Sequence, residues 1–510
     1  MQQYITTPIY YVNGAPHLGH AYTTIAADVT ARYYTMLGHE VKFLTGTDEH
    51  GQKVQQAAEV KNISPQDFTD EISQHFRRLV QTGENILGVS NTDFIRTTEP
   101  RHKQAAQAFW QALEASGMLY KSTYSGWYAT RDECYYQESE LIEGKAPTGA
   151  DVEWVEEDSI FFKLSAFQQP LLDYFATNPD CILPNSRMKE VVSFVRGGLK
   201  DLSISRTKLT WGVPVPNEPE HVMYVWVDAL TNYLTSCGYP DMQGEMHSQW
   251  EQGAPIHFIG KDILRFHAVY WLAMLMAVDL PLPKQIIAGG WWLVEGEKMS
   301  KSLGNVLAPD EPIEQFGLDI FRYFLLREIP FGNDGNFSQE ALIIRCNAEL
   351  ANNVGNLAQR TLSMIAKQCD HILPQAGEEP QDKTLLALAD SQLAPYHEAM
   401  QRADFSSALE SMLVVARAAN EYVDDQAPWV LKKENPTKMA AVLGTLAQTI
   451  HAIALMLLPF APSASQALLA QLGIENNEQH FKGTKPKIGA ALPAPQGVFP
   501  RMQIFKVPSE

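Results

Sequence analysis

The sequence has few cysteines, no long apolar run and no excess of positive charge. Its five cysteines are scattered over 510 residues and form no CxxC pair, which excludes a small domain held together by disulfides. An odd, scattered set is typical of reduced thiols in a cytosolic protein. The N-terminus lacks the basic and long apolar segments of a secretory signal, and no run of about 18 apolar residues indicates a membrane helix. We therefore expect a cytoplasmic protein with no membrane partner.

The charge balance is one-sided. The chain has 40 Lys and Arg against 59 Asp and Glu, a formal net charge of −19. Proteins that bind nucleic acid nonspecifically are usually basic, so this balance argues against such a binder. It leaves room for a local basic surface, because net charge does not show where the charges lie. With 45% apolar residues the chain can form a large core, and its length corresponds to about three domains.

Strand and helix patterns alternate at the start of the chain. Residues 4–12 are β-branched and aromatic, as in a buried strand, a helical pattern follows over 18–37, and a second strand over 41–46. Such alternation predicts an α/β fold with a Rossmann-type parallel sheet and right-handed crossovers. An aromatic, turn-rich stretch interrupts the pattern, which resumes with short apolar strands expected at 224–226 and 256–259.

The rest of the chain is mostly helical and ends in a proline-rich stretch. Ser338 predicts the N-cap of a long helix that continues to about residue 368. The expected segments are the first half of the sheet (1–117), an inserted lobe (118–213), the second half of the sheet (214–290), a loop and linking region (291–345), a helical bundle (346–470) and a C-terminal tail (471–510).

The sharpest motif is His17-Leu18-Gly19-His20, where the first strand turns into the first long helix. Imidazoles three residues apart share a helix face, and the free N–H groups and dipole of a helix N-terminus attract phosphate. Gly19 has no side chain, so a flat nucleotide can lie against the backbone. Both histidines are therefore candidates to stabilise phosphate charge in a transition state. Two surface histidines without a function are the alternative. A metal pair is less favoured, because no third ligand is obvious nearby.

The second motif, Lys298-Met299-Ser300-Lys301-Ser302, follows the last expected strand of the sheet. Two lysines and two hydroxyls on a short loop suit a triphosphate clamp, because the ammonium group is a compact point charge. An ordinary solvated basic loop is the alternative. The sequence contains no GxxxxGK[ST] and no GxGxxG after a strand, so ATP would have to be bound by these two motifs.

Together, HxGH near the start and KMSKS after the sheet resemble the signatures of class I aminoacyl-tRNA synthetases. The resemblance covers nearly the whole chain and is closest to the methionyl-tRNA synthetases. The matching segments are 8–14 (PIYYVNG), 46–51 (GTDEHG), 211–216 (WGVPVP), 224–229 (YVWVDA), 257–262 (HFIGKD), 356–360 (NLAQR) and 426–429 (QAPW). The resemblance implies a catalytic Rossmann-type sheet split by a connective insertion, followed by an α-helical anticodon-binding bundle. It also implies ATP-dependent ligation of L-methionine to tRNA(Met), initiator and elongator, through methionyl-adenylate.

The resemblance further implies roles for particular residues. The catalytic residues would be His17, His20, Lys298 and Lys301. The ATP-binding residues would be His17, Gly19, His20, Gly260, Asp262, Lys298, Ser300 and Lys301. The methionine-binding residues would be Ile9, Tyr11, Asp48, Trp226, Ala229, Leu230, Tyr233, Ile263 and His267. Asp48 would bind the ammonium group, and the apolar, aromatic pocket suits a thioether. The anticodon-binding residues would be Asn356, Arg360 and Trp429, with the indole stacked on an unpaired base.

The insertion departs from the family pattern. Many members carry a cysteine-based zinc knuckle there, but Ala129 and Asp132 stand where its first CxxC would align. Cys134 is alone, and a structural zinc site needs about four N or S ligands. We therefore predict no zinc and no protein ligand for any metal, with Mg²⁺ bound mainly through ATP. We also expect no appended tRNA-binding module of the kind that longer methionyl enzymes carry after the bundle, and hence a monomer.

Three alternatives stay open from the sequence. A class I synthetase of isoleucyl type is opposed by the short insertion, and one of cysteinyl type by the missing zinc ligands. A nucleotidyltransferase acting on a small molecule would leave the helical bundle unexplained. A noncatalytic RNA-binding paralogue is disfavoured because both motifs are intact.

Overall fold

The structure, a computed structural model, describes residues 1–503 apart from 13, 82, 132, 133, 137, 299–305, 476–478 and 484. The chain forms two compact units. The first, here called the sheet unit, consists of Met1–Pro16 and Val41–Gly289. The second, the bundle unit, consists of His17–Glu40 and Gly290–Glu510. The helix that carries the HxGH motif thus groups with the C-terminal half of the chain.

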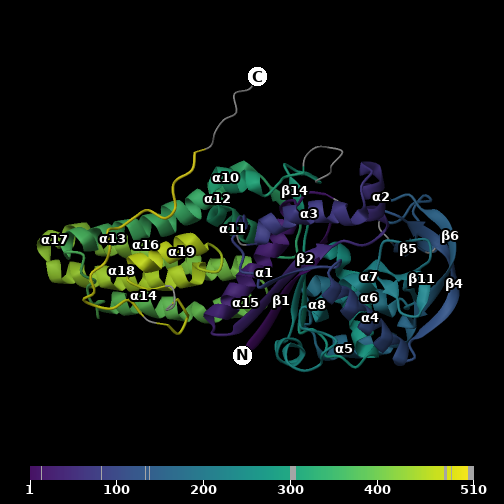
Figure 1. Cartoon of the computed structure of the whole chain (residues 1–510). Coiled ribbons are helices and arrows are strands. Elements are labelled where there is room, and N and C mark those ends of the chain that lie inside the picture. The colour runs from purple at the N-terminus through teal and green to yellow at the C-terminus, as the bar shows by residue number, and fades with distance from the viewer. Residues whose placement is uncertain are drawn as a thin grey trace, which may run out of the picture. The chain divides into compact units, whose positions relative to one another are not determined.

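A six-stranded sheet forms the centre of the sheet unit (Figure 1). Its order is β3 (Asp93–Arg96), β2 (Glu40–Asp48), β1 (Gln2–Tyr11), β12 (Ile256–Gly260), β13 (Gln285–Gly289) and β7 (Ile182–Leu183). Strand β12 pairs in parallel with β1 and β13, β13 with β7, and β2 with β3. The predicted parallel α/β sheet is confirmed. The chain order reverses beside β1, and parallel sheets bind ligands beyond the carboxyl ends of the strands at such a point.

Large aromatic side chains fill the core of this unit. Trp110, Trp250 and Trp271 are at most 1% exposed, and the rings of Phe109 and Trp271 lie 5.6 Å apart between centroids. Burial of a large apolar side chain contributes about 1.5–3 kcal/mol, so this cluster fixes the elements around it. The helices of the sheet unit are α2 (Gln52–Lys61), α3 (Pro65–Val80), α4 (Pro100–Ala115), α5 (Gln168–Thr177), α6 (Asn185–Arg196), α7 (Val225–Leu230), α8 (Asn232–Thr235) and α9 (Leu272–Ala277).

The strand predicted at 224–226 is wrong. Strand β11 (Glu218–Met223) ends before this segment, and Val225 begins helix α7. A short apolar run has no periodicity that separates a strand from a buried helix. Helix α7 includes Asp228, which is 1% exposed and pairs with His50 and His102 from distant segments.

The inserted region forms a long antiparallel ribbon, visible at the edge of Figure 1. Strand β4 (Leu119–Ala129) pairs with β6 (Glu153–Phe162) from Leu119↔Phe162 to Tyr128↔Glu153. The ribbon continues into β5 (Cys134–Tyr136) and β8 (Leu202–Ser203), and a smaller sheet joins β10 (Pro214–Val215), β11 and β9 (Ser205–Arg206). The region also supplies β7, the edge strand of the main sheet.

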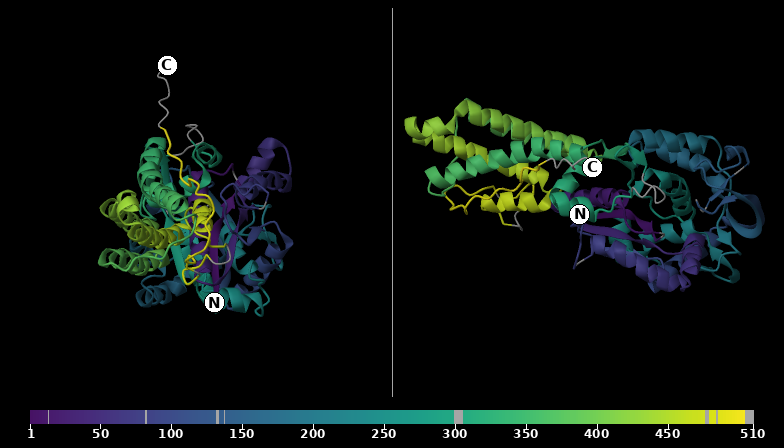
Figure 2. Two further views of the ribbon diagram at one scale, coloured as in Figure 1. Left: turned by 90° about the vertical axis from the view of Figure 1, so that its left-hand side faces the viewer. Right: turned by 90° about the horizontal axis from the view of Figure 1, so that it is seen from above.

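The bundle unit begins with α1 (Leu18–Met36) and a small sheet of β15 (Glu297–Lys298), β14 (Trp292–Val294) and β16 (Gly335–Phe337). Its helices are α10 (Asp310–Phe316), α11 (Leu318–Arg327), α12 (Gln339–Cys346), α13 (Asn356–Gln368), α14 (Pro380–Ser391), α15 (Leu393–Gln401), α16 (Phe405–Gln426), α17 (Pro428–Glu434), α18 (Pro436–Leu457) and α19 (Pro462–Gln471). The long helices lie side by side, as Figure 1 and the nearly end-on left view of Figure 2 show. The helix predicted from Ser338 is α12 and α13, joined by a π-helical stretch, η6 (Asn347–Gly355), and Ser338 caps it by accepting from the Ala341 N–H at 3.4 Å.

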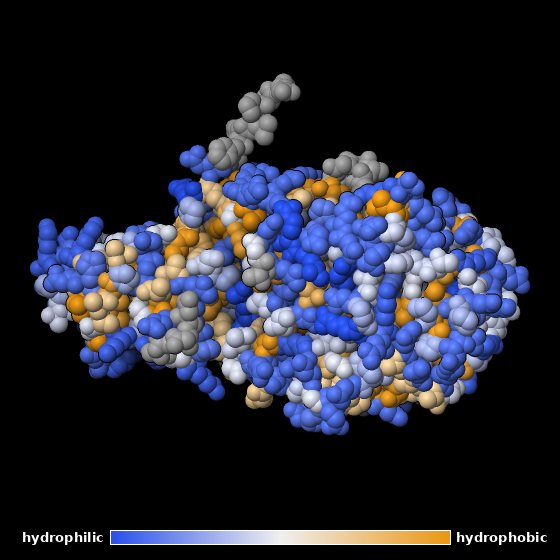
Figure 3. All heavy atoms as spheres, in the orientation of Figure 1, coloured by the Kyte–Doolittle hydropathy of each residue, from blue (hydrophilic) through white to orange (hydrophobic). Residues whose placement is uncertain are grey.

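Helix α18 is the core of the bundle. It packs against α13, α14, α16, α17 and α19. It is the one helix of the described ranges that is long and apolar enough to cross a membrane, but 78% of its most apolar stretch is buried within the protein, as in a core helix of a soluble protein. On the face drawn in Figure 3 hydrophilic residues predominate, with hydrophobic ones in small patches.

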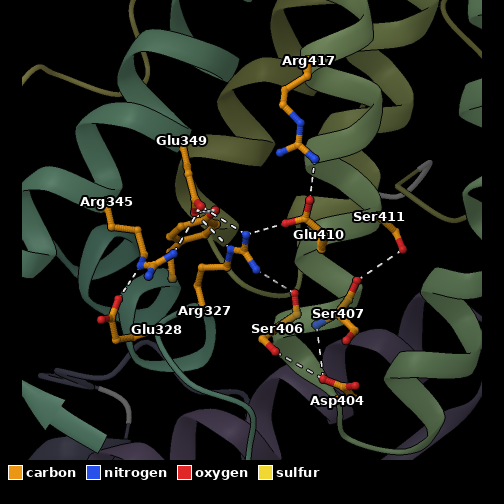
Figure 4. A network of polar contacts seen from close by, with 11 residues as sticks. Arg327, Glu328, Arg345, Glu349, Asp404, Ser406, Ser407, Glu410, Ser411 and Arg417 are labelled. Carbon is orange, nitrogen blue, oxygen red and sulfur yellow. Dashed lines mark hydrogen bonds and ion pairs between the residues drawn. The ribbon is translucent and has the colours of Figure 1, made fainter.

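A charged network joins α11 to the bundle (Figure 4). Arg327 donates to Glu349 of η6 at 3.1 Å and pairs with Glu410 of α16. Tyr323 donates to the same Glu349 at 2.6 Å, and Arg345 bridges Glu349 at 3.3 Å. Several charges in a network stabilise more than isolated surface pairs do.

The tail packs on the bundle. The side chain of Asn347 exchanges two hydrogen bonds of 2.8 Å with the backbone of Met502, and Gln471 accepts from the Gln496 N–H at 2.7 Å. Leu373 and Leu492 also bond to backbone of the facing segment at 2.9 Å and 2.7 Å. The described residues of the tail, as far as Met502, therefore pack within the bundle unit.

Candidate active site

The two motif histidines form the N-terminus of α1. His17 is the N-cap, with extended backbone (φ −137°, ψ 175°). Its Nδ1 accepts from the Gly19 N–H, and the His17 N–H donates to Nδ1 of His20, both at 3.1 Å. The rings are 3.8 Å apart between centroids. The sequence thus brings both imidazoles together at one helix end.

These hydrogen bonds fix the tautomer of His20. Burial, and to a lesser extent the charge of His17, hold the pKa of His20 well below its usual range, so this imidazole is neutral. Because Nδ1 accepts a hydrogen bond, the proton of the neutral ring lies on Nε2. An N–H donor at a helix N-terminus can hydrogen-bond an anion.

The second motif lies mostly outside the described residues. Lys298 ends β15, where its backbone pairs with Leu293, whereas Ser300 and Lys301 belong to the undescribed range 299–305. The chain directly after this range meets the first motif, because the Leu18 N–H donates to the carbonyl of Leu307 at 3.0 Å. Both motifs are therefore elements of the bundle unit.

The residues implied in methionine binding lie in the sheet unit, along one edge of its core. Ile9, Tyr11, Trp226 and Ile263 are partly buried and pack against the core cluster. The deeper residues are Ala229, Leu230, Tyr233 and His267, each at most 3% exposed. The indole of Trp226 stacks on Phe266, with ring centroids 3.9 Å apart and planes within 4°. Sequence reasoning missed Phe266, although it directly precedes His267.

Tyr233 and His267 form the polar end of this group. Their Oη and Nε2 atoms lie 2.7 Å apart, and His267 Nδ1 lies 3.0 Å from the carbonyl oxygen of Ile263. A carbonyl only accepts, so Nδ1 donates to it. Burial lowers the pKa of His267 to about 4, so the ring is neutral, and Nε2 accepts the Tyr233 hydroxyl proton. The pair contributes hydrogen-bonding capacity without net charge, which suits a thioether better than a charged side chain.

Asp48 is the last residue of β2 and is 7% exposed. A carboxylate this buried interacts strongly with a cation, because little water screens it. On the neighbouring strand end, the ring of Tyr11 lies 4.9 Å from Nζ of Lys53.

Gly260 is the last residue of β12, and Asp262 lies two residues beyond it. A Cβ atom at position 260 would lie 2.6 Å from Oδ1 of Asp262, closer than real contacts allow. The Asp262 side chain would have to move if position 260 carried a Cβ atom, and Asp262 itself is exposed to solvent. The backbone and the carboxylate are thus open to a ligand beyond the strand end.

A buried polar layer supports Asp48 and was not found from the sequence. Glu49 is fully buried and accepts from Arg96 at 2.6 Å and 2.9 Å. Next to it, His50 Nδ1 lies 2.6 Å from a carboxylate oxygen of Asp228, whose other oxygen lies 2.7 Å from His102 Nε2. The signal in the sequence was the run of three ionisable residues, 48–50, directly after an apolar strand.

The residues implied in anticodon binding lie in the bundle unit. The guanidinium of Arg360 lies 5.2 Å from the ring centroid of Trp429 and 3.6 Å from a carboxylate oxygen of Asp424. Trp429 is 41% exposed, and Asn356 is exposed one turn before Arg360. An exposed indole beside a guanidinium offers a base both stacking and charge.

The inserted ribbon ends in a small apolar cluster. Ala129, fully buried, packs there with Tyr136, Ala146 and Ala150. In the part of the chain that the structure describes, no group of three or more His, Cys, Asp or Glu side chains could hold a metal ion. Asp132 lies outside that part, as does the side chain of Cys134, so the zinc-free knuckle stays a prediction.

Comparison with known proteins identifies the family. The family model "tRNA synthetases class I (M)" matches residues 3–153 and 146–362, and "Anticodon binding domain of methionyl tRNA ligase" matches residues 373–507. The chain is 50% identical to the methionine–tRNA ligase of Rickettsia felis over 98% of both chains, and 50% identical to that of Brucella suis over 98% of this chain and 97% of the other. The structure of Mycobacterium tuberculosis methionyl-tRNA synthetase in complex with methionyl-adenylate matches with a TM-score of 0.94 and 45% identity, over 98% of this chain and 100% of that one. The chain therefore belongs to the methionyl-tRNA synthetases, class I enzymes that activate methionine and ligate it to tRNA.

Proposed function

We propose a division of labour for this reaction in which the sheet unit selects methionine and the bundle unit supplies the phosphate-binding and anticodon-binding residues. The observation that carries the proposal is the pair of neutral aromatic contacts, Trp226 on Phe266 and Tyr233 with His267, in the same unit as the buried Asp48. A carboxylate and a neutral apolar pocket together match an amino acid with an uncharged side chain. Asp48 binds its ammonium group, and the pocket binds its thioether.

In the first step, a carboxylate oxygen of methionine attacks the α-phosphorus of ATP. The bond from that phosphorus to the bridging oxygen breaks, which releases pyrophosphate and leaves methionyl-adenylate. His17 and His20 stabilise the charge that develops on the α-phosphate. Lys298 and Lys301, with Ser300, neutralise the leaving pyrophosphate. Gly260 and Asp262 bind the adenosine, with the carboxylate on the ribose hydroxyls.

ATP is bound with Mg²⁺, which belongs to the substrate in this proposal and is held mainly by the triphosphate and water. The second step transfers the methionyl group to a hydroxyl of the terminal adenosine of tRNA, which attacks the acyl carbonyl and releases AMP. The protein orients the reactants throughout and forms no covalent intermediate.

The bundle, residues 346–470, recognises the anticodon of initiator and elongator tRNA(Met). Asn356 and Arg360 hydrogen-bond its bases, and Trp429 stacks on one of them. Residues 1–117 and 214–290 form the catalytic halves, 118–213 the connective insertion, 291–345 the link and 471–510 the tail. We further propose that the enzyme is a cytoplasmic monomer whose local basic residues, rather than its net charge, attract tRNA.

The proposal is tested by ATP–pyrophosphate exchange screened over the twenty amino acids, followed by acylation of total tRNA. Exchange should depend on methionine, and the charged tRNA should be tRNA(Met). If exchange depended on another amino acid and not on methionine, the assignment of the methionine-binding residues would be wrong. Exchange without acylation would indicate a nucleotidyltransferase of small molecules.

The insertion is tested separately by metal analysis of the purified protein. We expect far less than one zinc per chain, because the family's cysteine positions hold Ala129 and Asp132. Zinc close to one equivalent would show that other residues complete a site.

A further inference from the structure

The buried carboxylate of Asp228 connects segments that are far apart in the sequence. Asp228 is 1% exposed, and its two oxygens bind His50 Nδ1 at 2.6 Å and His102 Nε2 at 2.7 Å. His50 and His102 are at most 1% exposed. Neither the reaction steps above nor the family motifs used so far assign a task to this His–Asp–His cluster.

The two histidines connect Asp228 to different segments of the sheet unit. His50 follows Asp48 by two residues, directly after β2. His102 lies in α4, where its Nδ1 is 3.2 Å from the hydroxyl of Thr235 in α8. One side of Asp228 is therefore bound to the segment that carries the ammonium-binding carboxylate. The other side is bound to α4, which carries none of the residues assigned to methionine and which contacts α8, the helix of Tyr233, through Thr235.

Asp228 itself lies within the helix that forms the pocket. Helix α7 carries Trp226, Ala229 and Leu230, three of the residues assigned to methionine binding. The bond to His50 thus joins the two halves of the methionine site, one for the ammonium group and one for the side chain. Catalytic geometry is sensitive to such spacing, since a misplacement of about 1 Å costs on the order of 100-fold in rate.

Stabilisation of the fold alone does not account for this buried cluster. A buried ion pair is often no more stabilising than apolar side chains of the same volume. Burial alone would raise the pKa of Asp228, but the charge of His50 and the hydrogen bonds from both histidines outweigh it and hold that pKa well below its usual range. The buried carboxylate of Asp228 and its two partners fix the relative positions of the segments that carry them, because each partner must stay within hydrogen-bond distance.

Other contacts hold the same segment and would keep it folded without His50. Arg96 binds Glu49, the Glu49 N–H donates to the Thr97 hydroxyl at 2.9 Å, and the Gly51 N–H donates to the Trp211 carbonyl at 3.1 Å. These contacts anchor the segment to β3 and to the loop after β9. Within the described residues, His50 supplies its side-chain link to α7.

We propose that Asp228 is a positioning residue for methionine recognition, which acts through His50 to fix the separation between the carboxylate of Asp48 and the pocket face of α7. The inference rests on the proposed roles of Asp48 and the pocket. It assigns to Asp228 no contact with methionine or ATP.

The test compares the two histidines, since they bind the same carboxylate but connect it to different segments. His50→Leu and His102→Leu each remove one hydrogen bond to Asp228. His50→Asn retains a donor, because the Asn amide nitrogen reaches the position of imidazole Nδ1. The measurements are KM for methionine, KM for ATP and kcat in pyrophosphate exchange, with the melting temperature and the fraction of active sites for each variant.

We expect His50→Leu to raise KM for methionine about tenfold or more, with KM for ATP within about twofold of the parent. His50→Asn should recover most of the loss. His102→Leu should lower the melting temperature by an amount similar to His50→Leu, because the two hydrogen bonds to Asp228 are equally buried. It should leave KM for methionine within about twofold, because His102 does not hold the segment that carries Asp48.

Two results would overturn the proposal. One is an equal rise in KM for methionine in His50→Leu and His102→Leu, which would indicate a general structural role. The other is a His50→Leu enzyme of lowered stability with unchanged KM for methionine. If His50→Leu does not fold, His50→Gln is compared with His102→Asn, since each of these polar side chains places its amide nitrogen away from the ring nitrogen that binds Asp228. A rise in KM for methionine in His50→Gln alone supports the proposal, and an equal rise in both variants overturns it. Failure of the proposed function is distinguishable, because the parent protein would then show no methionine-dependent exchange.

Discussion

The role of Asp48 gives the sharpest prediction for the methionine site. Asp48→Asn keeps the shape of the side chain and removes its charge. The carboxylate is 7% exposed, so water screens its attraction for an ammonium group only weakly. Hydrogen bonds to charged groups contribute roughly 1.5–3 kcal/mol, which corresponds to about 10- to 150-fold in affinity.

A double-mutant cycle with the ligand isolates this interaction. The second ligand is the analogue of methionine that lacks the amino group, measured as a competitive inhibitor of pyrophosphate exchange. In the parent enzyme, loss of the amino group should weaken binding by roughly 10- to 150-fold. In Asp48→Asn, removal of the amino group from the ligand should change its affinity little, because the carboxylate proposed to bind that group is gone.

A matched control is Asp262→Asn, the same substitution two residues after strand β12. It should raise KM for ATP and leave KM for methionine near the parental value, since Asp262 is proposed to bind the ribose. The reasoning is refuted if Asp48→Asn weakens methionine and its desamino analogue by the same factor. In that case Asp48 would shape the site without binding the ammonium group.

Three further predictions follow from other parts of the molecule. Lys301→Ala should lower the rate of pyrophosphate exchange and spare methionine affinity, and exchange at the parental rate would contradict the clamp. Trp429→Ala should impair aminoacylation while exchange without tRNA stays nearly intact, whereas equal losses in both assays would indicate that the indole only packs. His267 has a pKa of about 4 when folded, against 6.5 as the ordinary value. The unfolded chain therefore binds a proton between these pH values that the folded chain does not, and the free energy of unfolding falls as pH falls through this window. His267→Gln should reduce the loss of unfolding free energy between pH 7 and pH 5 by about 2 kcal/mol in urea titrations, and an unchanged pH dependence would mean that His267 is protonated in the folded state.

Local patterns in the sequence were sufficient to predict the parallel sheet. Alternating strands and helices predicted the parallel arrangement that β1, β12 and β13 confirm. The cap at Ser338 and the helix to residue 368 were also predictable, because both depend on neighbours in the sequence. The π-helical stretch Asn347–Gly355 inside that helix was not, since its reason lies in packing against other elements.

The candidate site was predictable only where a motif marked it. The pairing of His17 and His20 follows from their spacing on one helix. The cluster of His50, His102 and Asp228 has no such pattern, because its three members are brought together by tertiary folding alone. The prediction of a strand at 224–226 also gave no sign that Asp228 lies in a helix, α7. Similarly, no periodicity distinguished Phe266, which stacks on Trp226, from an ordinary core residue.

The most direct test of the whole account is the stoichiometry of the adenylate. The purified chain is mixed with labelled ATP, methionine and pyrophosphatase, and the adenylate bound to the protein is counted after rapid gel filtration. The account predicts about one methionyl-adenylate per chain, formed only when methionine is present, and almost none in His20→Ala, which removes an imidazole proposed to stabilise the α-phosphate. Adenylate formed with another amino acid in preference to methionine, or at the parental level in His20→Ala, would contradict it.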